Sequence, residues 1–314
     1  MSTSELVRHD LQFGDGCRWL DLDLAHCELD ALLQDLIPDW PLLRSNFLSE
    51  GAPVGYLEHE GGLYLAFRGA DLNPGGTPEN MVAVRAWFND KLVITASRRA
   101  TRSVGDLVER IEQGNAPEDA PSILFGLAKR LAFHLSPLQK EFESELDGFE
   151  DALLDGHGDD NVHSDRKLSS LRRAVLLLRR RVLSVRRGVL PQIELLDDLE
   201  EDMPAPLREE PHEHLLQEAR QRFSRHLEDL DGKRDRTVLL AEEVAGLQEE
   251  RTNRRTYVFT VVAGVFLPLG FVTGLLGINV GGMPGADHPM AFWWVTLGLA
   301  AMGVALWLRL RDTR

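Results

Sequence analysis

The segment Tyr257–Leu276, YVFTVVAGVFLPLGFVTGLL, decides the architecture of this chain of 314 residues. Its 20 residues carry no charge and span about 30 Å as a helix, which is enough to cross the hydrocarbon layer of a bilayer. A second apolar run of 18 residues follows at Ala291–Leu308, AFWWVTLGLAAMGVALWL. Two such runs in succession predict two transmembrane helices rather than a pair of buried core helices.

Basic residues flank this pair of runs on one side only. Arg251, Arg254 and Arg255 precede the first run, and three more arginines follow the second at positions 309, 311 and 314. The connecting segment 277–290 has no Lys or Arg and a single acid, Asp287. By the positive-inside rule we expect an inner (plasma) membrane protein with both termini in the cytoplasm and the short loop outside. Met1–Gly16 has no apolar core, so we expect no signal peptide.

The charge of the chain is acidic and unevenly distributed. The net charge is −15, and the residues from Tyr257 onward contribute +1 to it. The remaining acidic body argues against nucleic acid as a partner and suits a protein that meets cations. The two cysteines, Cys17 and Cys27, exclude a disulfide framework and the paired spacing of structural zinc sites. Since no nucleophile–base constellation is present, we expect neither an enzyme nor a covalently bound cofactor.

The first 100 residues alternate short β-like runs with helical ones and predict a cytoplasmic α/β domain. The expected strands are Arg18–Asp23, Gly62–Arg68, Val82–Phe88 and Lys91–Ser97, with a hairpin turn at Asn89-Asp90. A helix is expected over Glu28–Ile37, ending before Pro38. The predicted divisions of the whole chain are 1–100 for this domain, 101–255 for a helical funnel and stalk, 256–278 and 291–308 for the two spans, 279–290 for the outer loop and 309–314 for a cytoplasmic tail.

The funnel and stalk region segregates its charges between helices. Pro137–Asp155 is an acidic helix, and Asp165–Arg187 is a basic helix whose apolar residues recur with a coiled-coil period. We expect these two helices to pair as an antiparallel hairpin; binding of the basic helix to nucleic acid or anionic lipid is the alternative. From His212 to Pro268 nothing breaks the helical pattern, which predicts one helix of about 65 residues entering the first span.

A hairpin of two helices encloses no pore, so a transport function requires several copies around one axis. The first apolar run contains no Asp, Glu, His, Lys, Arg or Cys. A transition metal therefore finds no strong ligand there. A divalent ion would pass largely hydrated, in contact with backbone carbonyls, the hydroxyls of Thr260 and Thr273 and the carboxamide of Asn279.

The tripeptide Gly277-Ile278-Asn279 at the end of the first span resembles the Gly-x-Asn signature of the CorA metal-ion transporter superfamily. Ile278 in place of the usual Met, and the following GGMPG at 281–285, resemble the ZntB zinc-transporter branch. The stretch Gly61–Phe88 also resembles the N-terminal domain of that branch.

The resemblance implies a CorA-like fold and a homopentamer in the lipid bilayer that moves divalent cations, preferably zinc. Gly277, Ile278 and Asn279 would form an outer selectivity ring, and the first span would line the pore. Counting inward along a helix, the pore-lining positions are Thr260, Ala263, Leu267, Gly270 and Gly274. Leu267 and Phe259 would form hydrophobic constrictions.

Candidate metal ligands lie outside the first span. Asp287 and His288 in the outer loop would attract cations, and His157, Asp159, Asp160 and His163 form a possible loop site. His212-Glu213-His214 and the pair His26-Cys27 are weaker candidates. The acidic stretch Asp197–Asp202 either concentrates cations or keeps the surface soluble.

Two other functions remain open from the sequence. One is a broad or magnesium-selective channel of the same superfamily, against which Ile278 is the evidence. The other is a membrane-anchored coiled-coil scaffold or sensor that carries no ion, in which Asn279 would be replaceable.

Overall fold

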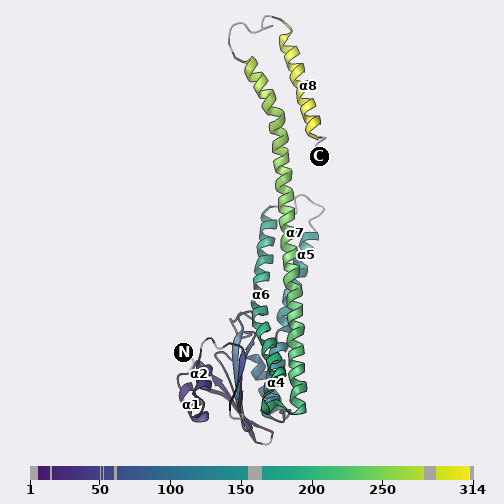
Figure 1. Ribbon diagram of the computed structural model, residues 1–314. Coiled ribbons are helices and arrows are strands. Elements are labelled where there is room, and N and C mark those ends of the chain that lie inside the picture. The colour runs from purple at the N-terminus through teal and green to yellow at the C-terminus, as the bar shows by residue number, and fades with distance from the viewer. Residues whose placement is uncertain are drawn as a thin grey trace. The chain divides into compact units, whose positions relative to one another are not determined.

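The computed structural model describes residues 6–14, 16–49, 51, 53–59, 62–154, 165–278 and 288–311. The chain divides into two compact units, Met1–Ala241 and Glu242–Arg314. The first contains a six-stranded sheet and a helical stalk, and the second contains the two apolar helices (Figure 1).

The sheet is mixed, with strand order β1-β2-β6-β5-β4-β3. Its strands are β1 (Val7–Phe13), β2 (Cys17–Asp23), β3 (Gly55–His59), β4 (Gly62–Gly69), β5 (Val82–Phe88) and β6 (Leu92–Ser97). Only β2 and β6 pair in parallel; the other neighbours are antiparallel. The central strands are buried on both faces, which is why their sequences are apolar almost throughout.

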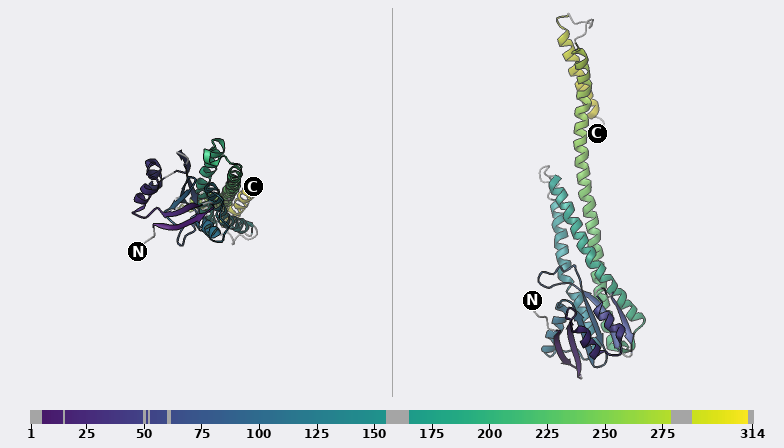
Figure 2. Two further views of the ribbon diagram at one scale, coloured as in Figure 1. Left: turned by 90° about the horizontal axis from the view of Figure 1, so that it is seen from below. Right: turned by 90° about the vertical axis from the view of Figure 1, so that its left-hand side faces the viewer.

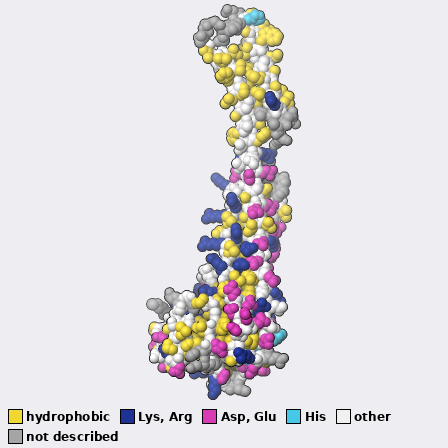
Figure 3. All heavy atoms as spheres, in the orientation of Figure 1, with side chains coloured by type: hydrophobic (Ala, Val, Ile, Leu, Met, Phe, Trp, Pro, Cys, Tyr) yellow, Lys and Arg dark blue, Asp and Glu magenta, His cyan; other side chains and the backbone are white. Residues whose placement is uncertain are grey.

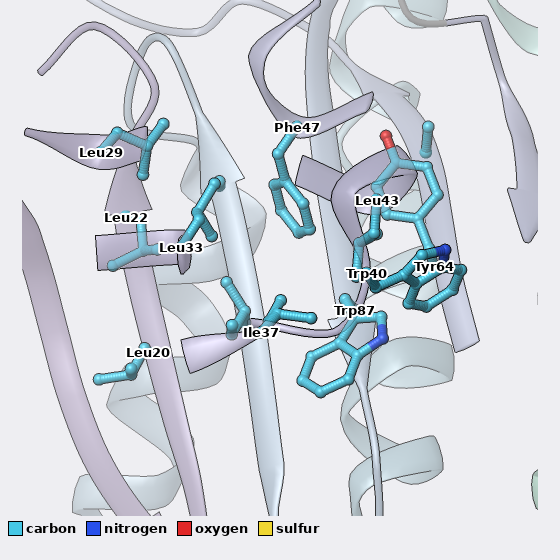
Figure 4. Packing of buried hydrophobic residues seen from close by; sticks show 13 residues of the cluster. Leu20, Leu22, Leu29, Leu33, Ile37, Trp40, Leu43, Phe47, Tyr64 and Trp87 are labelled. Atoms are coloured by element: carbon cyan, nitrogen blue, oxygen red, sulfur yellow. The ribbon is translucent and has the colours of Figure 1, made fainter. Parts of the chain in front are cut away.

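Helices cover both faces of this sheet. On one face α1 (Leu29–Leu36) and α2 (Pro41–Leu48) pack on alternate strand residues such as Leu20, Tyr64 and Trp87 (Figure 4). On the other face lie α3 (Arg102–Glu112), α4 (Ala120–Phe133) and part of α6 (Asp165–Glu201). The domain is therefore a three-layer α/β structure. The sequence predicts its α/β class, and its second helical layer comes from helices that follow residue 100.

The predicted strands at β2, β4, β5 and β6 are confirmed, and so is the turn between the last two, where Asn89 N donates to Leu92 O at 3.0 Å. Three elements of the first 100 residues were not predicted: β1, α2 and β3. β1 has a neighbour only on one side, so its sequence VRHDLQF keeps charged side chains that hide the strand pattern.

The stalk is built from α5 (Ser136–Leu154), α6 and the first part of α7 (Glu210–Leu276), which run side by side in Figure 1 and in the right-hand view of Figure 2. The predicted α5–α6 pairing is confirmed. The buried seam of α6 comprises Leu168, Val175, Leu178, Val182 and Val185, as its heptad spacing predicts. α7 has 67 residues and is continuous through Pro268, which confirms the prediction of one long helix.

The predicted end of the basic helix at Arg187 is wrong. α6 continues through Pro191 to Glu201, so the acidic residues from Asp197 belong to its last turns. Burial of Val189, Ile193 and Leu196 on the sheet side outweighs the hydrogen bond that Pro191 removes. The side chain of Gln192 donates to Gly188 O at 3.0 Å in the same turn.

Candidate ion pathway

Two helices of the second unit are long and apolar enough to cross a membrane. The mean hydropathy reaches 2.1 in the apolar part of α7 and 1.7 in α8 (Ala291–Arg311), and neither segment is buried within the chain. The two run antiparallel beside each other (Figures 1 and 2). A Cβ placed on Gly303 of α8 would lie 3.5 Å from Leu269 Cδ1 of α7, so the two helices are in contact at this glycine.

The apolar part of α7 has two distinct faces. One face is half-buried and comprises Val261, Gly264, Val265, Pro268, Leu269 and Val272. The five positions predicted to line a pore are all exposed: Thr260, Ala263, Leu267, Gly270 and Gly274. At 100° per residue their mean direction is about 150° from that of the half-buried face. The predicted line therefore lies on the side of α7 that α8 leaves open.

The two threonines in this segment direct their hydroxyl protons into their own helix. Thr260 Oγ1 donates to Thr256 O at 2.8 Å, and Thr273 Oγ1 donates to Leu269 O at 3.0 Å. The lone pairs of each oxygen are left as acceptors. Water bound to a cation directs its protons outward, so these oxygens have the polarity that suits a hydrated cation.

α7 ends at Leu276, directly before the predicted selectivity tripeptide. Gly277 N donates to Thr273 O at 2.9 Å and closes the last turn, and Ile278 follows with its side chain 49% exposed. Asn279 and Asp287 lie outside the described residues. His288 is described and exposed, and its Nδ1 accepts a hydrogen bond from Met290 N at 3.2 Å.

The predicted metal ligands of the first unit do not come together in the part that the structure describes. His157, Asp159, Asp160 and His163 lie outside the described residues. Among the residues that are described, no three His, Cys, Asp or Glu side chains are grouped so as to hold a metal ion. Cys17 is buried, Cys27 is exposed, and both are free thiols.

His212 has a structural partner. Its side chain is buried, and its Nε2 lies 2.7 Å from Asp119 Oδ2. Asp119 also caps α4 by accepting a hydrogen bond from Ser122 N at 2.9 Å. Although burial opposes it, hydrogen bonds from Ser122 and His212 hold the pKa of Asp119 below its usual value. His212 therefore ties the start of α7 to the start of α4, while His214 is exposed on another face.

The acidic helix α5 is held by one arginine from each neighbouring helix. Arg181 of α6 binds Glu141, Glu145 and the buried Glu79. Arg236 of α7 binds Glu143, Asp147 and Glu150. The predicted pairing of the acidic helix with α6 accounts for the first of these two sets, and the second faces α7, because positions on two sides of one helix meet two partners.

A half-buried histidine joins α5 to α7 near the sheet. His226 Nδ1 lies 2.5 Å from Gln139 Oε1, and Gln139 Nε2 donates to His226 O at 2.9 Å. Burial lowers the pKa of His226, and the positive charges of Arg225 and Arg222 lower it further. The negative charge of Asp229 opposes this shift. Burial therefore favours the neutral imidazole.

A lowered histidine pKa makes the fold sensitive to acid. Neutral His226 makes its full contribution to the free energy of unfolding above the ordinary histidine pKa of 6.5. That contribution is lost as the pH falls below 6.5, because the unfolded chain then binds the proton more readily than the folded chain does. We expect the unfolding temperature to fall between pH 7 and pH 5, measured by scanning calorimetry. His226→Gln should remove that part of the pH dependence, and an unchanged profile would contradict the assignment.

The fold and the two apolar helices define an integral membrane protein with an α/β domain, a helical stalk and a C-terminal hairpin of spans. The chain matches the CorA-like Mg2+ transporter protein family over residues 14–311. It belongs to that family, and the CorA-like fold predicted from its sequence is confirmed.

Named relatives of the chain handle divalent metals. It is 33% identical over 250 residues to the zinc transport protein ZntB of Pectobacterium carotovorum, covering 79% of this chain and 73% of that protein. It is 32% identical over 297 residues to the divalent cation transporter CmaX of Pseudomonas aeruginosa, covering 94% of this chain and 86% of that one. The solved structure of full-length CmaX matches with a TM-score of 0.76 at 31% identity, covering 96% of this chain and 90% of that chain.

Proposed function

We propose that this chain is a homo-oligomeric transporter of the inner membrane, a pentamer with both termini in the cytoplasm, that moves divalent cations and prefers zinc. The ion passes largely hydrated through a central pore lined by the apolar part of α7. Gly277, Ile278 and Asn279 form the outer ring that receives it, and Asp287 and His288 gather cations at the entrance. In this proposal the α/β domain comprises residues 1–100, and the helical funnel and stalk comprise 101–255. The pore helix is 256–278, the outer loop 279–290, the second span 291–308 and the cytoplasmic tail 309–314.

One observation carries this proposal: the exposed line on α7 opposite α8. Five positions, each about one turn from the next, share one open side, and all are uncharged. When several copies surround one axis, their lines together enclose a passage that contains no strong metal ligand. A cation in this passage therefore keeps its water of hydration and is not retained. The acceptor oxygen of Thr260, which lies on this line, supports a hydrated cargo.

Zinc is the preferred cargo because Ile278 replaces the Met of the magnesium signature and because ZntB is a zinc transport protein. A broader divalent selectivity is the second candidate. It is favoured by the similarity to CmaX, which is described as a divalent cation transporter.

The test is zinc entry into liposomes that contain the purified full chain. We expect zinc flux with little magnesium flux, and Asn279→Ala should lower the zinc flux by about tenfold or more, which corresponds to about 1.4 kcal/mol of lost stabilisation. Asn253→Ala, the same change on α7 before its apolar part, is the matched control and should keep full flux. Comparable magnesium flux would favour the broader selectivity. No flux from an intact oligomer, with or without a pH gradient, would favour the scaffold or sensor.

A further inference from the structure

The outer side of α6 carries a second heptad-spaced line of residues, which we call the basic stripe: Arg173, Leu176, Arg180, Leu183 and Arg187. It lies about 150° around the helix from the buried seam that packs within the chain. Leu176 is 45% exposed. Within the part of the chain that the structure describes, the three arginines of the stripe form no ion pair, and Arg187 donates only to Leu183 O of its own helix.

α7 carries a complementary line, the acidic stripe: Glu228, Gly232, Asp235 and Leu239. All four are exposed, Leu239 by 64%. Asp235 pairs only with its chain neighbour Arg234, and Glu228 forms no ion pair among the described residues. Charged side chains of opposite sign gather on different sides of the stalk (Figure 3).

Gly232 has no reason to be glycine within its own chain. It lies inside α7, where glycine costs about 1 kcal/mol relative to alanine. A Cβ placed on it would meet nothing within 4 Å, and its φ is not in the left-handed region. A glycine on an exposed helix face suits the close approach of another side chain.

The two stripes lie at matching levels along the stalk. The bond from Arg186 Nε to Asp231 Oδ1, 2.7 Å long, fixes the level of antiparallel α6 against α7. Because the two helices are antiparallel, residue numbers that fall along α6 from Arg186 correspond in level to residue numbers that rise along α7 from Asp231. By this count the paired positions of the two stripes lie at the same level to within two residues, or about 3 Å. Rotation about an axis along these helices keeps every level, so a second copy brings Arg187 to Glu228, Leu183 to Gly232, Arg180 to Asp235 and Leu176 to Leu239.

We propose that the basic stripe of one copy docks on the acidic stripe of the next copy around the ring. This contact is heterologous, as a closed ring requires, because two different patches of the same chain meet. In this contact two arginines of the basic stripe pair with two carboxylates of the acidic stripe. Between these ion pairs Leu183 packs against Gly232, and beyond them Leu176 packs against Leu239. The inference rests on the proposed function, since a hairpin of two spans makes a pore only when several copies assemble.

Disulfide trapping tests the pairing in the full chain, purified in detergent. In a Cys27→Ser background, Arg180→Cys combined with Asp235→Cys should give a ladder of linked copies after mild oxidation, seen on a non-reducing gel. Arg180→Cys with Gln221→Cys is the matched control: Gln221 is exposed on the same helix but about 21 Å lower, and should give no ladder. An intact oligomer without a ladder, or with links only inside single copies, would overturn the proposal.

Substitutions test the contact without cysteines. Arg180→Glu should weaken assembly at least tenfold in concentration, and Arg180→Glu with Asp235→Arg should restore it, as measured by mass photometry. Gly232→Leu should raise the unfolding temperature of the single chain while weakening assembly, an outcome that damage to the fold would not give. Arg110→Glu, the same charge change on α3, should leave assembly unchanged, and equal weakening by it would overturn the proposal.

The outcomes separate the two proposals. A ladder of linked copies that carries no cation flux would leave the docking intact and remove the transport function. Cation flux from an oligomer that never links through these cysteines would leave the transport function intact and remove the docking.

Discussion

Replacing Leu267 by serine should make the pore leak. Leu267 is 76% exposed on the open side of α7, midway along its apolar part, where a ring of leucines would repel water. A hydroxyl at this position lets water fill the constriction and lowers the barrier to a hydrated ion. We expect zinc flux at least about tenfold above that of the unmodified chain, since each 1.4 kcal/mol removed from a barrier is a factor of ten.

The matched control for this experiment is Val262→Ser. Val262 is 48% exposed on α7 but faces neither the predicted pore line nor α8. Its substitution should leave flux unchanged, measured with a fluorescent zinc indicator inside the liposomes. If both variants leak equally, the effect comes from a disturbed membrane helix, and Leu267 does not line the pathway.

The largest effect on stability is expected for Arg181→Met. Arg181 binds two carboxylates of α5 and one from the loop between β4 and β5, and its guanidinium lies 5.0 Å from the centre of the Phe142 ring. The critical partner is Glu79, whose side chain is only 6% exposed and would be left as an unpaired buried charge. We expect a loss of about 3 kcal/mol in the free energy of unfolding. The unfolding temperature of the full chain in detergent, followed by circular dichroism, should fall by roughly 6–12 °C.

A second substitution separates the buried charge from lost packing. Arg181→Met with Glu79→Gln removes the unpaired charge and should recover about half of the lost stability. Arg234→Met, whose ion pairs are both with acids of its own helix, should cost under about 1 kcal/mol. Equal losses in Arg181→Met and Arg234→Met would show that the α5 carboxylates do not depend on the arginine of α6.

The parts of the fold with a strong periodicity were predictable. Strands β4 to β6 alternate or are apolar throughout, and α7 keeps its pattern over 67 residues. What escaped prediction depends on contacts far along the chain. Arg85 is the clearest example: it sits inside strand β5, is 3% exposed, and donates to the carbonyls of Phe47 and Ser49 at the end of α2. No local pattern predicts that a buried arginine will complete a helix end.

Of the candidate site, the line of positions on α7 was predictable from the sequence, whereas contacts between distant residues were not. Helical spacing placed Thr260, Ala263, Leu267, Gly270 and Gly274 on one side, and the structure leaves that side open. The histidine at 212 was ambiguous because a sequence contains no sign of its partner Asp119, which lies 93 residues away. The two stripes were not predicted, because charged residues in a heptad spacing are equally typical of a helix face that only meets solvent.

The threonine geometry has a consequence for anions. A chloride or phosphate that leaves water needs N–H or O–H donors to replace its hydration. In the apolar part of α7 the backbone N–H groups are used by the helix, and the hydroxyl proton of Thr260, the hydroxyl on the predicted pore line, is bound to Thr256 O at 2.8 Å. A passage lined in this way rejects anions although it carries no fixed negative charge. Because no group in that lining titrates, its preference for positive ions should hold at every pH at which the protein remains folded.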